Sequence, residues 1–108
     1  MGKVKSKTID ASSVRCERGS VTDYLVSLGN PRAMAALYAD AFVEWQESVA
    51  NITKNGSVVA NPRTGAPIDN PYLKVRNGAQ ARLLNLQRVK TGGLWDCDWS
   101  KADAKTED

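Results

Sequence analysis

The chain contains no histidine. Without an imidazole it cannot form a Ser-His-Asp or Cys-His catalytic group, a histidine-liganded nuclease site or most structural zinc sites. Phosphate-binding loops of the GxxxxGK[ST] and GxGxxG types are also missing, so nothing in the sequence supports an ATPase or a dehydrogenase. We therefore expect no enzymatic activity, no metal and no cofactor.

Aromatic residues and cysteines are scarce as well. Aromatic side chains make up 6% of the chain, and three of them are Trp. The two cysteines, Cys16 and Cys97, belong to no CxxC pair. We interpret them as reduced thiols of an intracellular protein, with a disulfide between them as the alternative. No stretch approaches the ~20 apolar residues of a membrane span, and no basic-then-apolar leader opens the chain, so we expect a soluble protein without membrane contact.

The size and overall composition are those of one globular domain. Of the 108 residues, 42% are apolar and 25% are charged, which argues against disorder throughout the chain. A domain near this size buries roughly two-thirds of the surface of its unfolded chain. Self-association would therefore add to its stability.

Charge alternates in sign along the chain. The net charge is +3 and the isoelectric point is about 9.0. Residues 1–20 carry five basic and two acidic side chains, and residues 21–60 carry two basic and four acidic ones. Residues 61–90 carry six basic side chains and one acidic one, and residues 91–108 carry two basic and five acidic ones. Such alternation suits either nucleic-acid contact or docking between subunits, and charge alone does not decide between them.

The order of these compositions divides the chain into three parts. Residues 1–16 contain lysines among small and polar residues and are predicted to be a flexible basic arm. Residues 17–92 are predicted to form a helical core domain with a β excursion at residues 57–69. Residues 93–108 form an acidic tail that contains two of the Trp residues.

Two helices are predicted in the first half of the core domain. A partial capping box at Ser20 and Asp23 predicts the start of a short helix, and Gly29 predicts its end. Asn30-Pro31 supplies a cap and a first helical residue for a long helix that runs to about Lys54. Its apolar stripe consists of Met34, Leu37, Tyr38, Ala41, Phe42, Trp45, Val49 and Ile52.

Acidic residues lie on the other side of the predicted long helix. Asp40 and Glu44 are spaced i, i+4 and can approach each other, and Glu47 follows on the same side. A carboxylate pair could serve acid-base chemistry or bind a metal. Because no histidine or further acidic cluster accompanies them, we interpret these residues as a solvated helix face.

The second half is predicted to contain a small hairpin and a third helix. Val58 and Val59 favour a strand, and Pro62 and Pro67 limit its ladder to a few residues. Asn70-Pro71 then repeats the cap-and-proline start, which predicts a helix from Tyr72 to about Lys90. One apolar strip consists of Tyr72, Val75, Ala79, Leu83 and Leu86, and a second one, suited to a neighbouring subunit, consists of Leu73 and Leu84.

The predicted fold is therefore mainly α: a short helix, a long helix, a small β-hairpin excursion and a third helix. We expect the long and third helices to pack as an antiparallel pair. Trp95 and Trp99 follow among acidic residues and have two interpretations. They either dock onto a partner or fold back to close a small core.

The order of these features resembles the small subunits of bacteriophage terminases, which are DNA-packaging machines. In one branch of that family an aromatic helix, here residues 38–45, precedes a Gly-containing turn and a Val-rich excursion, here residues 55–59. A second Gly and an Asn-Pro-initiated helix with clustered Leu follow, here residues 64–65 and 70–86. The resemblance covers about residues 20 to 90. The chain departs from the branch after the third helix, where Lys90-Thr91-Gly92-Gly93-Leu94-Trp95 replaces a Gly-Leu-Thr-Pro-Ser-Ser-Arg type of ending.

The resemblance implies an oligomeric, ring-like assembly without catalytic residues. It implies that the protein recognises a packaging site on double-stranded DNA and delivers that DNA to the terminase large subunit, which carries the ATPase and nuclease. The location would be the cytoplasm of the bacterial host, for a protein of a phage or of a satellite element.

Basic residues are the candidate DNA contacts, although salt bridges to the acidic helix would explain some of them equally well. The candidates are Lys3, Lys5, Lys7, Arg15, Arg18, Lys74, Arg76, Arg82, Arg88 and Lys90. The candidate oligomer interface consists of Leu73, Leu84, Trp95 and Trp99. A second hypothesis is a small non-catalytic adaptor or inhibitor that binds its partner through the Trp-containing acidic tail.

Overall fold

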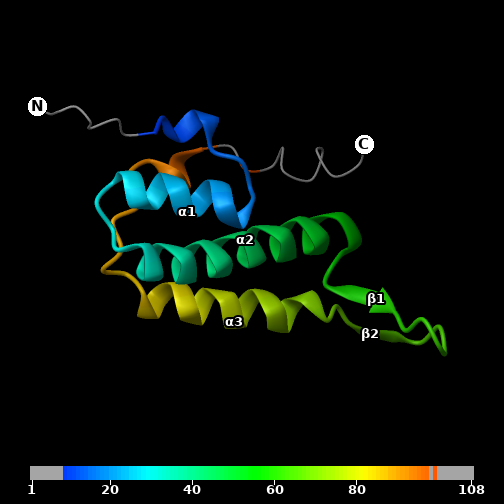
Figure 1. Ribbon diagram of the computed structural model, residues 1–108. Helices are drawn as coiled ribbons and strands as arrows, with labels where there is room; N and C mark the ends of the chain where they lie inside the picture. The colour runs from blue at the N-terminus through cyan, green and yellow to red at the C-terminus, as the bar shows by residue number, and fades with distance from the viewer. Residues whose placement is uncertain (1–8, 98, 100–108) are drawn as a thin grey trace, which may run out of the picture.

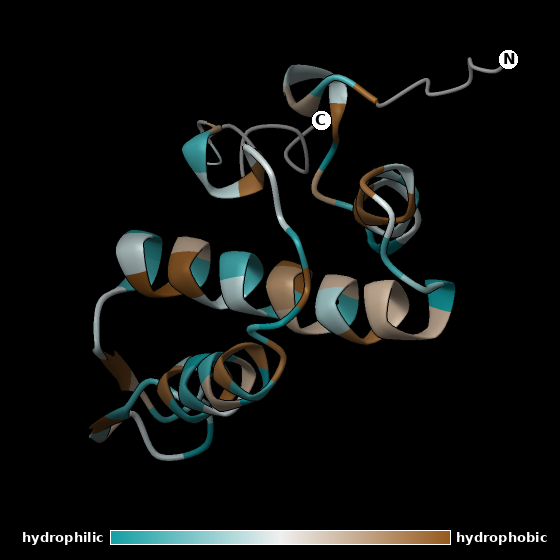
Figure 2. Cartoon of the chain, turned by 90° about the vertical axis from the view of Figure 1, so that its left-hand side faces the viewer, coloured by the Kyte–Doolittle hydropathy of each residue, from teal (hydrophilic) through white to brown (hydrophobic). Residues whose placement is uncertain are grey.

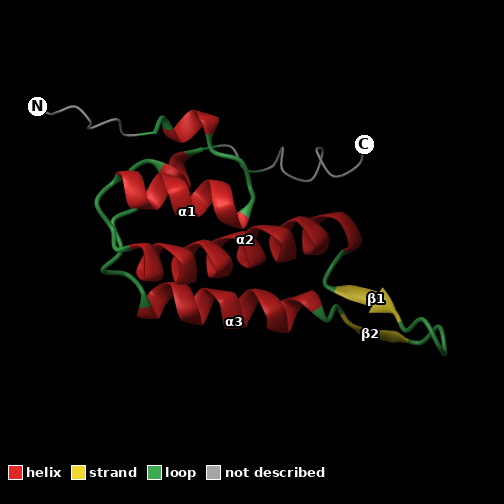
Figure 3. Cartoon of the chain, in the orientation of Figure 1, coloured by secondary structure: helices red, strands yellow, loops and turns green. Residues whose placement is uncertain are grey.

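The computed structural model describes residues 9–97 and 99 and is mainly helical, as predicted (Figures 1 and 3). Lys3, Lys5 and Lys7 of the predicted basic arm lie outside the described residues. In chain order the elements are η2 (Ala11–Ser13), α1 (Arg18–Ser27), α2 (Arg32–Asn55), β1 (Val58–Ala60), β2 (Pro67–Asp69), α3 (Tyr72–Asn85) and η3 (Leu94–Asp96).

The long helix α2 lies between α1 and α3 (Figure 1). Helices α2 and α3 run in opposite directions, as predicted, because the hairpin between them reverses the chain. Figure 2 shows α1 and α3 nearly end-on while α2 crosses the view, so α2 runs obliquely to both. The hairpin of β1 and β2 lies beyond the C-terminal end of α2, away from α1.

Helix α1 begins two residues before the predicted capping box. The prediction that Ser20 caps the helix is wrong, because the helix starts at Arg18 and Glu17 occupies the cap position without a side-chain hydrogen bond. The Ser20 hydroxyl instead accepts a hydrogen bond from the backbone N of Arg15, over 2.9 Å. The predicted end is confirmed: Gly29 has φ of 102°, a left-handed conformation that favours glycine.

Helix α2 buries more of its surface than one stripe, because it packs against both other helices. Ala35, Ala39 and Val43 are buried in addition to the predicted Tyr38 and Phe42. Leu37 belongs to the predicted apolar stripe but does not join the core, since this side chain is 58% exposed. Trp45, also in the predicted apolar stripe, is half-buried and packs against the core.

Helix α3 is shorter than predicted. It ends at Asn85 instead of about Lys90, and the chain turns at Leu86. Ala79 and Leu83 are buried as predicted, whereas Tyr72 is 41% exposed and does not join the core. Tyr72 is the first residue of the helix, and it lines an open hollow together with Asn51 and Asn55 of α2.

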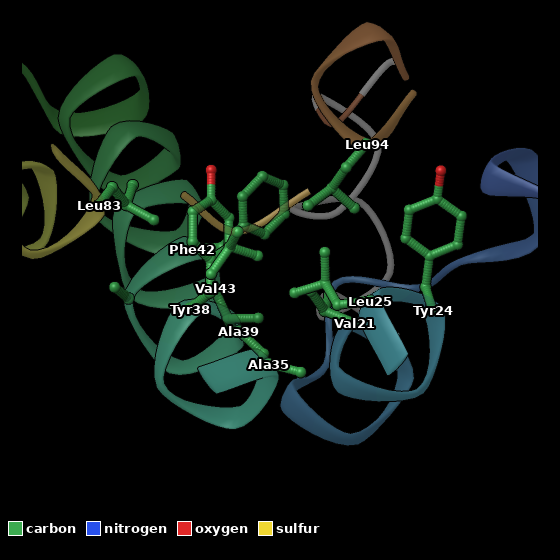
Figure 4. Close-up of a cluster of buried hydrophobic side chains, with 12 residues drawn as sticks. Val21, Tyr24, Leu25, Ala35, Tyr38, Ala39, Phe42, Val43, Leu83 and Leu94 are labelled. Atoms are coloured by element: carbon green, nitrogen blue, oxygen red, sulfur yellow. The ribbon is translucent and has the colours of Figure 1, made fainter. Parts of the chain in front are cut away.

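The segment after α3 folds back over α1 and α2. Leu94 of η3 is completely buried and points toward Leu25 and Phe42 (Figure 4). The rings of Trp95 and Trp99 stand edge-on to Phe42, with centroid separations of 4.6 and 5.1 Å. Trp99 therefore packs against the core, as one of the two interpretations predicts, whereas Trp95 contacts Phe42 and also remains 40% exposed.

Part of the predicted basic arm is also packed. Ala11, Val14 and Cys16 lie against the core, and η2 is capped by the side chain of Asp10. The sulfur of Cys97 contacts the carbonyl oxygen of Ala11 at 3.4 Å, which places the beginning and end of the described chain together. No disulfide joins Cys16 and Cys97, both of which are described.

Candidate nucleic-acid and subunit interfaces

Three helices meet at an ion-pair network centred on Asp40. Its carboxylate accepts hydrogen bonds from the guanidinium groups of Arg18 of α1, at 2.5 Å, and Arg82 of α3, at 3.3 Å. Arg82 also pairs with Glu44, one turn further along α2. The hydrogen bond from Arg18 is the main reason that the pKa of Asp40 is lowered, and the same bond raises the pKa of Arg18. Asp40 and Glu44 of the predicted acidic face are therefore engaged by α1 and α3, whereas Glu47 is exposed.

Two further arginine pairs among the described residues are exposed. Arg15 lies 3.3 Å from Glu17, and Arg32 at the start of α2 lies 3.6 Å from Asp23. Exposed pairs of this kind contribute only about 0–1 kcal/mol. Of the predicted DNA contacts, Arg15, Arg18 and Arg82 thus face carboxylates of the same chain.

The other predicted cations within the described residues are not neutralised in this way. Lys74, Arg88 and Lys90 are exposed and form no ion pair with any residue that the structure describes. Arg76 donates to the side chain of Asn77. Because α3 ends at Asn85, Arg88 and Lys90 lie beyond the helix and share no helix face with Arg76.

Sequence reasoning missed Arg63. It is exposed in the loop between β1 and β2, and it too has no ion pair within the described part of the chain. Between residues 48 and 95 the sequence contains one carboxylate, Asp69, against seven lysines and arginines. That imbalance is visible in the sequence and could have drawn attention to the hairpin.

Two buried asparagines tie the loops to the helices. Asn30, 8% exposed, donates to the carbonyl oxygens of Leu25 and Lys90 over 2.8 and 2.7 Å. Asn70, 3% exposed, donates to the Gly56 carbonyl oxygen over 2.9 Å and to the Asn51 side chain over 3.0 Å. Both precede proline, which is the signal by which sequence reasoning identified them as caps only.

Asn70 does act as a cap, and Asn30 does not. The side-chain oxygen of Asn70 accepts from the backbone N of Tyr72, over 2.9 Å, at the first residue of α3. The side-chain oxygen of Asn30 accepts from the backbone N of Lys90, over 2.9 Å, rather than from the start of α2. The predicted capping role of Asn30 is therefore wrong.

A shallow groove opens between α2, α3 and the segment that follows α3. Its volume is about 410 Å³, and Tyr38, Trp45, Leu83, Leu84 and Trp95 are among its lining residues. The indole N of Trp95 donates to the Tyr38 hydroxyl over 2.8 Å, and burial raises the pKa of Tyr38. Two large apolar side chains remain accessible here: Leu84 is 59% and Trp95 is 40% exposed.

The structure brings two of the four predicted interface residues to this groove. Leu84 and Trp95 line it, whereas Trp99 packs against Phe42 and its indole N donates to the Leu94 carbonyl oxygen. Leu73 is half-buried near the start of α3.

Within residues 9–97 and 99, no three or more His, Cys, Asp or Glu side chains are grouped so that they could hold a metal ion. No helix in the same part of the chain has the length and apolar character needed to cross a membrane.

Comparison with known proteins identifies a family for most of the helical domain. Residues 21–88 match the family model described as phage terminase, small subunit. No curated protein and no solved structure gives a match. The matched stretch contains most of α1 and all of α2, the hairpin and α3, whereas Leu94, Trp95 and Trp99 lie outside it. Since this stretch covers more than half of the chain, the protein belongs to the phage terminase small-subunit family.

Proposed function

We propose that this protein is the DNA-recognition subunit of a packaging terminase, acting in the cytoplasm of the host bacterium. It forms a homo-oligomer, binds the packaging site on double-stranded DNA and presents that DNA to the large subunit, which carries the ATPase and nuclease. The small subunit itself has no catalytic role. Membership of the family supports a role in DNA packaging.

The observation that carries the DNA-binding part is the set of cations without carboxylate partners. Lys74, Arg88 and Lys90 are exposed and unpaired within the described residues, in a stretch of chain that is nearly free of carboxylates. Unneutralised cations release condensed counterions when they meet DNA phosphates, which favours binding. Arg18 and Arg82 would first have to leave Asp40, so we assign them to the fold rather than to DNA.

The groove beside Leu84 and Trp95 is the proposed contact between subunits. Its exposed apolar side chains would leave water when a second copy covers them, and each Å² of buried apolar surface contributes about 25 cal/mol. Several such contacts, repeated from subunit to subunit, would close a ring.

The DNA-binding proposal is tested by fluorescence anisotropy with a labelled mixed-sequence duplex over a range of salt concentrations. We expect the logarithm of the binding constant to fall linearly with the logarithm of salt concentration, with a slope of about −0.9 for each phosphate contact. Binding that is absent at low salt, or that does not change with salt, would refute the proposal.

A second candidate function, an adaptor or inhibitor that docks through the tail, has less support. It requires Trp95 and Trp99 to reach a partner, and both rings contact Phe42 of the same chain. Truncation after Gly93 separates the two functions. An adaptor would lose its partner and keep its fold, whereas we expect the truncated protein to be destabilised because it lacks the buried Leu94.

A further inference from the structure

We propose that the β1–β2 hairpin enters a groove of double-stranded DNA and that Arg63 is its contact residue. This inference rests on the proposed DNA-binding function and adds a site to it. The loop with Arg63 was not among the contacts expected from the sequence.

The position of the hairpin leaves it open to a large partner. Beyond the end of α2 it extends away from the other elements (Figures 1 and 3), and every loop residue from Pro62 to Ala66 is exposed. Val58 pairs with Asp69 and Ala60 pairs with Pro67, and all four are exposed. A two-stranded ribbon has the dimensions that the major groove of B-DNA admits.

The loop that carries Arg63 is ordered by its own hydrogen bonds. The side-chain oxygen of Asn61 accepts from the backbone N of Arg63 at 2.8 Å, and the carbonyl oxygen of Asn61 accepts from Gly65 at 2.7 Å. The loop is closed where the backbone N of Asn61 donates to the Ala66 carbonyl oxygen, also at 2.8 Å. Binding therefore requires little further ordering of the backbone around Arg63, which lowers the entropic cost.

The base of the hairpin is fixed as well. An isolated two-stranded hairpin is at best marginally stable in water. Here the buried Asn70 joins it to α2 through Gly56 and Asn51, and caps α3 through Tyr72. The hairpin is thus held in one direction relative to the helices.

Charge favours DNA as the occupant. Arg63 is the only cation from Gly56 to Asp69, and it has no ion-pair partner among the described residues. The one carboxylate of the hairpin, Asp69, pairs with Val58 at its base, at the opposite end from Arg63. Lys74, also exposed, follows in the first turn of α3, near the base of the hairpin. An arginine at the tip of the ribbon can donate two parallel hydrogen bonds to a guanine edge or to a phosphate, and Lys74 can reach a flanking phosphate.

The test compares two single charge removals in the full-length protein. Arg63→Gln removes the tip cation, and Arg32→Gln is the matched control, because Arg32 is an exposed arginine at the opposite end of α2. We expect Arg63→Gln to weaken binding to the labelled duplex about tenfold and to make the salt slope shallower. Arg32→Gln should change the affinity less than about twofold. Arg63→Lys should bind more tightly than Arg63→Gln and more weakly than wild type, because lysine keeps the charge without the planar fork of arginine.

The binding measurements can overturn the inference in three ways. Wild-type protein that does not bind DNA would overturn the proposed function and this inference together. If wild-type protein binds and Arg63→Gln binds equally well, only the inference fails. If Arg63→Gln instead changes the solution mass and leaves DNA affinity per assembly unchanged, the hairpin contacts a neighbouring subunit and the inference is also overturned.

Discussion

The side chain of Asn30 forms two hydrogen bonds with the backbone of Lys90, donating to its carbonyl oxygen and accepting from its amide nitrogen. A third bond runs to the carbonyl oxygen of Leu25. One buried amide thereby connects the end of α1, the start of α2 and the chain that leaves α3. The segment with Leu94 and Trp95 owes its position over the core to this connection and to the hydrogen bond from the backbone N of Gly93 to the Tyr24 hydroxyl, over 3.0 Å.

Asn30→Ala should therefore destabilise the protein. It removes three hydrogen bonds and leaves the backbone N and carbonyl oxygen of Lys90 without the side chain that pairs them, whereas the Leu25 carbonyl oxygen keeps the backbone N of Leu28. We expect the free energy of unfolding to fall by about 2–4 kcal/mol. Urea denaturation followed by circular dichroism measures this difference. Asn85→Ala is the matched control, because Asn85 is exposed on α3, and we expect a change within about 0.5 kcal/mol. Equal stability of the two variants would show that the Asn30 connection does not hold the segment.

Leu94→Ala tests whether the segment after α3 is part of the core. Leu94 has no exposed surface, so the truncation leaves a cavity, and we expect a loss of about 2–5 kcal/mol in the free energy of unfolding. Leu37→Ala makes the same change on a side chain that is 58% exposed and should cost little. Intact stability of Leu94→Ala, measured by the same denaturation experiment, would place the segment outside the core.

Low pH should weaken the network around Asp40. The pKa of Asp40 in the folded protein is below its ordinary value of 3.8, so its ion pairs stabilise the fold above that pH, and their contribution is lost as pH falls through the folded pKa. Asp40→Asn should lower the free energy of unfolding by about 1 kcal/mol at neutral pH, since the side chains are half-exposed. The difference from wild type should shrink as the pH falls below 3.8.

Asp23→Asn is the control for that experiment, because Asp23 pairs with the exposed Arg32 alone among the residues that the structure describes. The Asp23→Asn variant should lose less free energy of unfolding at neutral pH than Asp40→Asn, because it removes a single exposed ion pair. A difference between Asp40→Asn and wild type that stays constant from neutral to acid pH would contradict the assignment of these ion pairs.

Paired and unpaired cations should contribute differently to DNA binding. The double variant Lys74→Gln/Arg88→Gln should weaken binding and make the salt slope shallower by about 1.8 for two lost phosphate contacts per bound subunit. Arg18→Gln should leave the salt slope nearly unchanged, because Arg18 is already paired with Asp40. Anisotropy titrations across salt measure both slopes. A larger effect from Arg18→Gln would show that the ion-pair network opens to bind DNA.

Local signals in the sequence were sufficient for most element boundaries. Gly29 follows α1 with a positive φ, a conformation that favours glycine. The two Asn-Pro pairs precede α2 and α3, as predicted. The valine-rich excursion forms the predicted hairpin, with Val59 opposite Ile68. These features depend on backbone preferences of a few neighbouring residues, which a sequence displays directly.

Features that depend on distant parts of the chain were not predictable in the same way. The apolar Leu83, Leu84 and Leu86 continue a helical pattern, yet α3 ends at Asn85. The chain after α3 is held at Lys90 by the side chain of Asn30, which is 60 positions away. The pairing of Arg82 with Asp40 spans 42 positions, and no local pattern specifies it. For the candidate site, the sequence indicated the basic stretch but not which cations already face carboxylates.

The most direct test of the whole account is the solution mass of the wild-type protein, measured by light scattering on a sizing column with and without duplex DNA. We predict a discrete species of many subunits that persists at physiological salt and elutes as one larger complex when DNA is added. A monomer whose mass does not change with DNA, at low or physiological salt, would contradict the proposal that this protein assembles and recognises DNA for packaging.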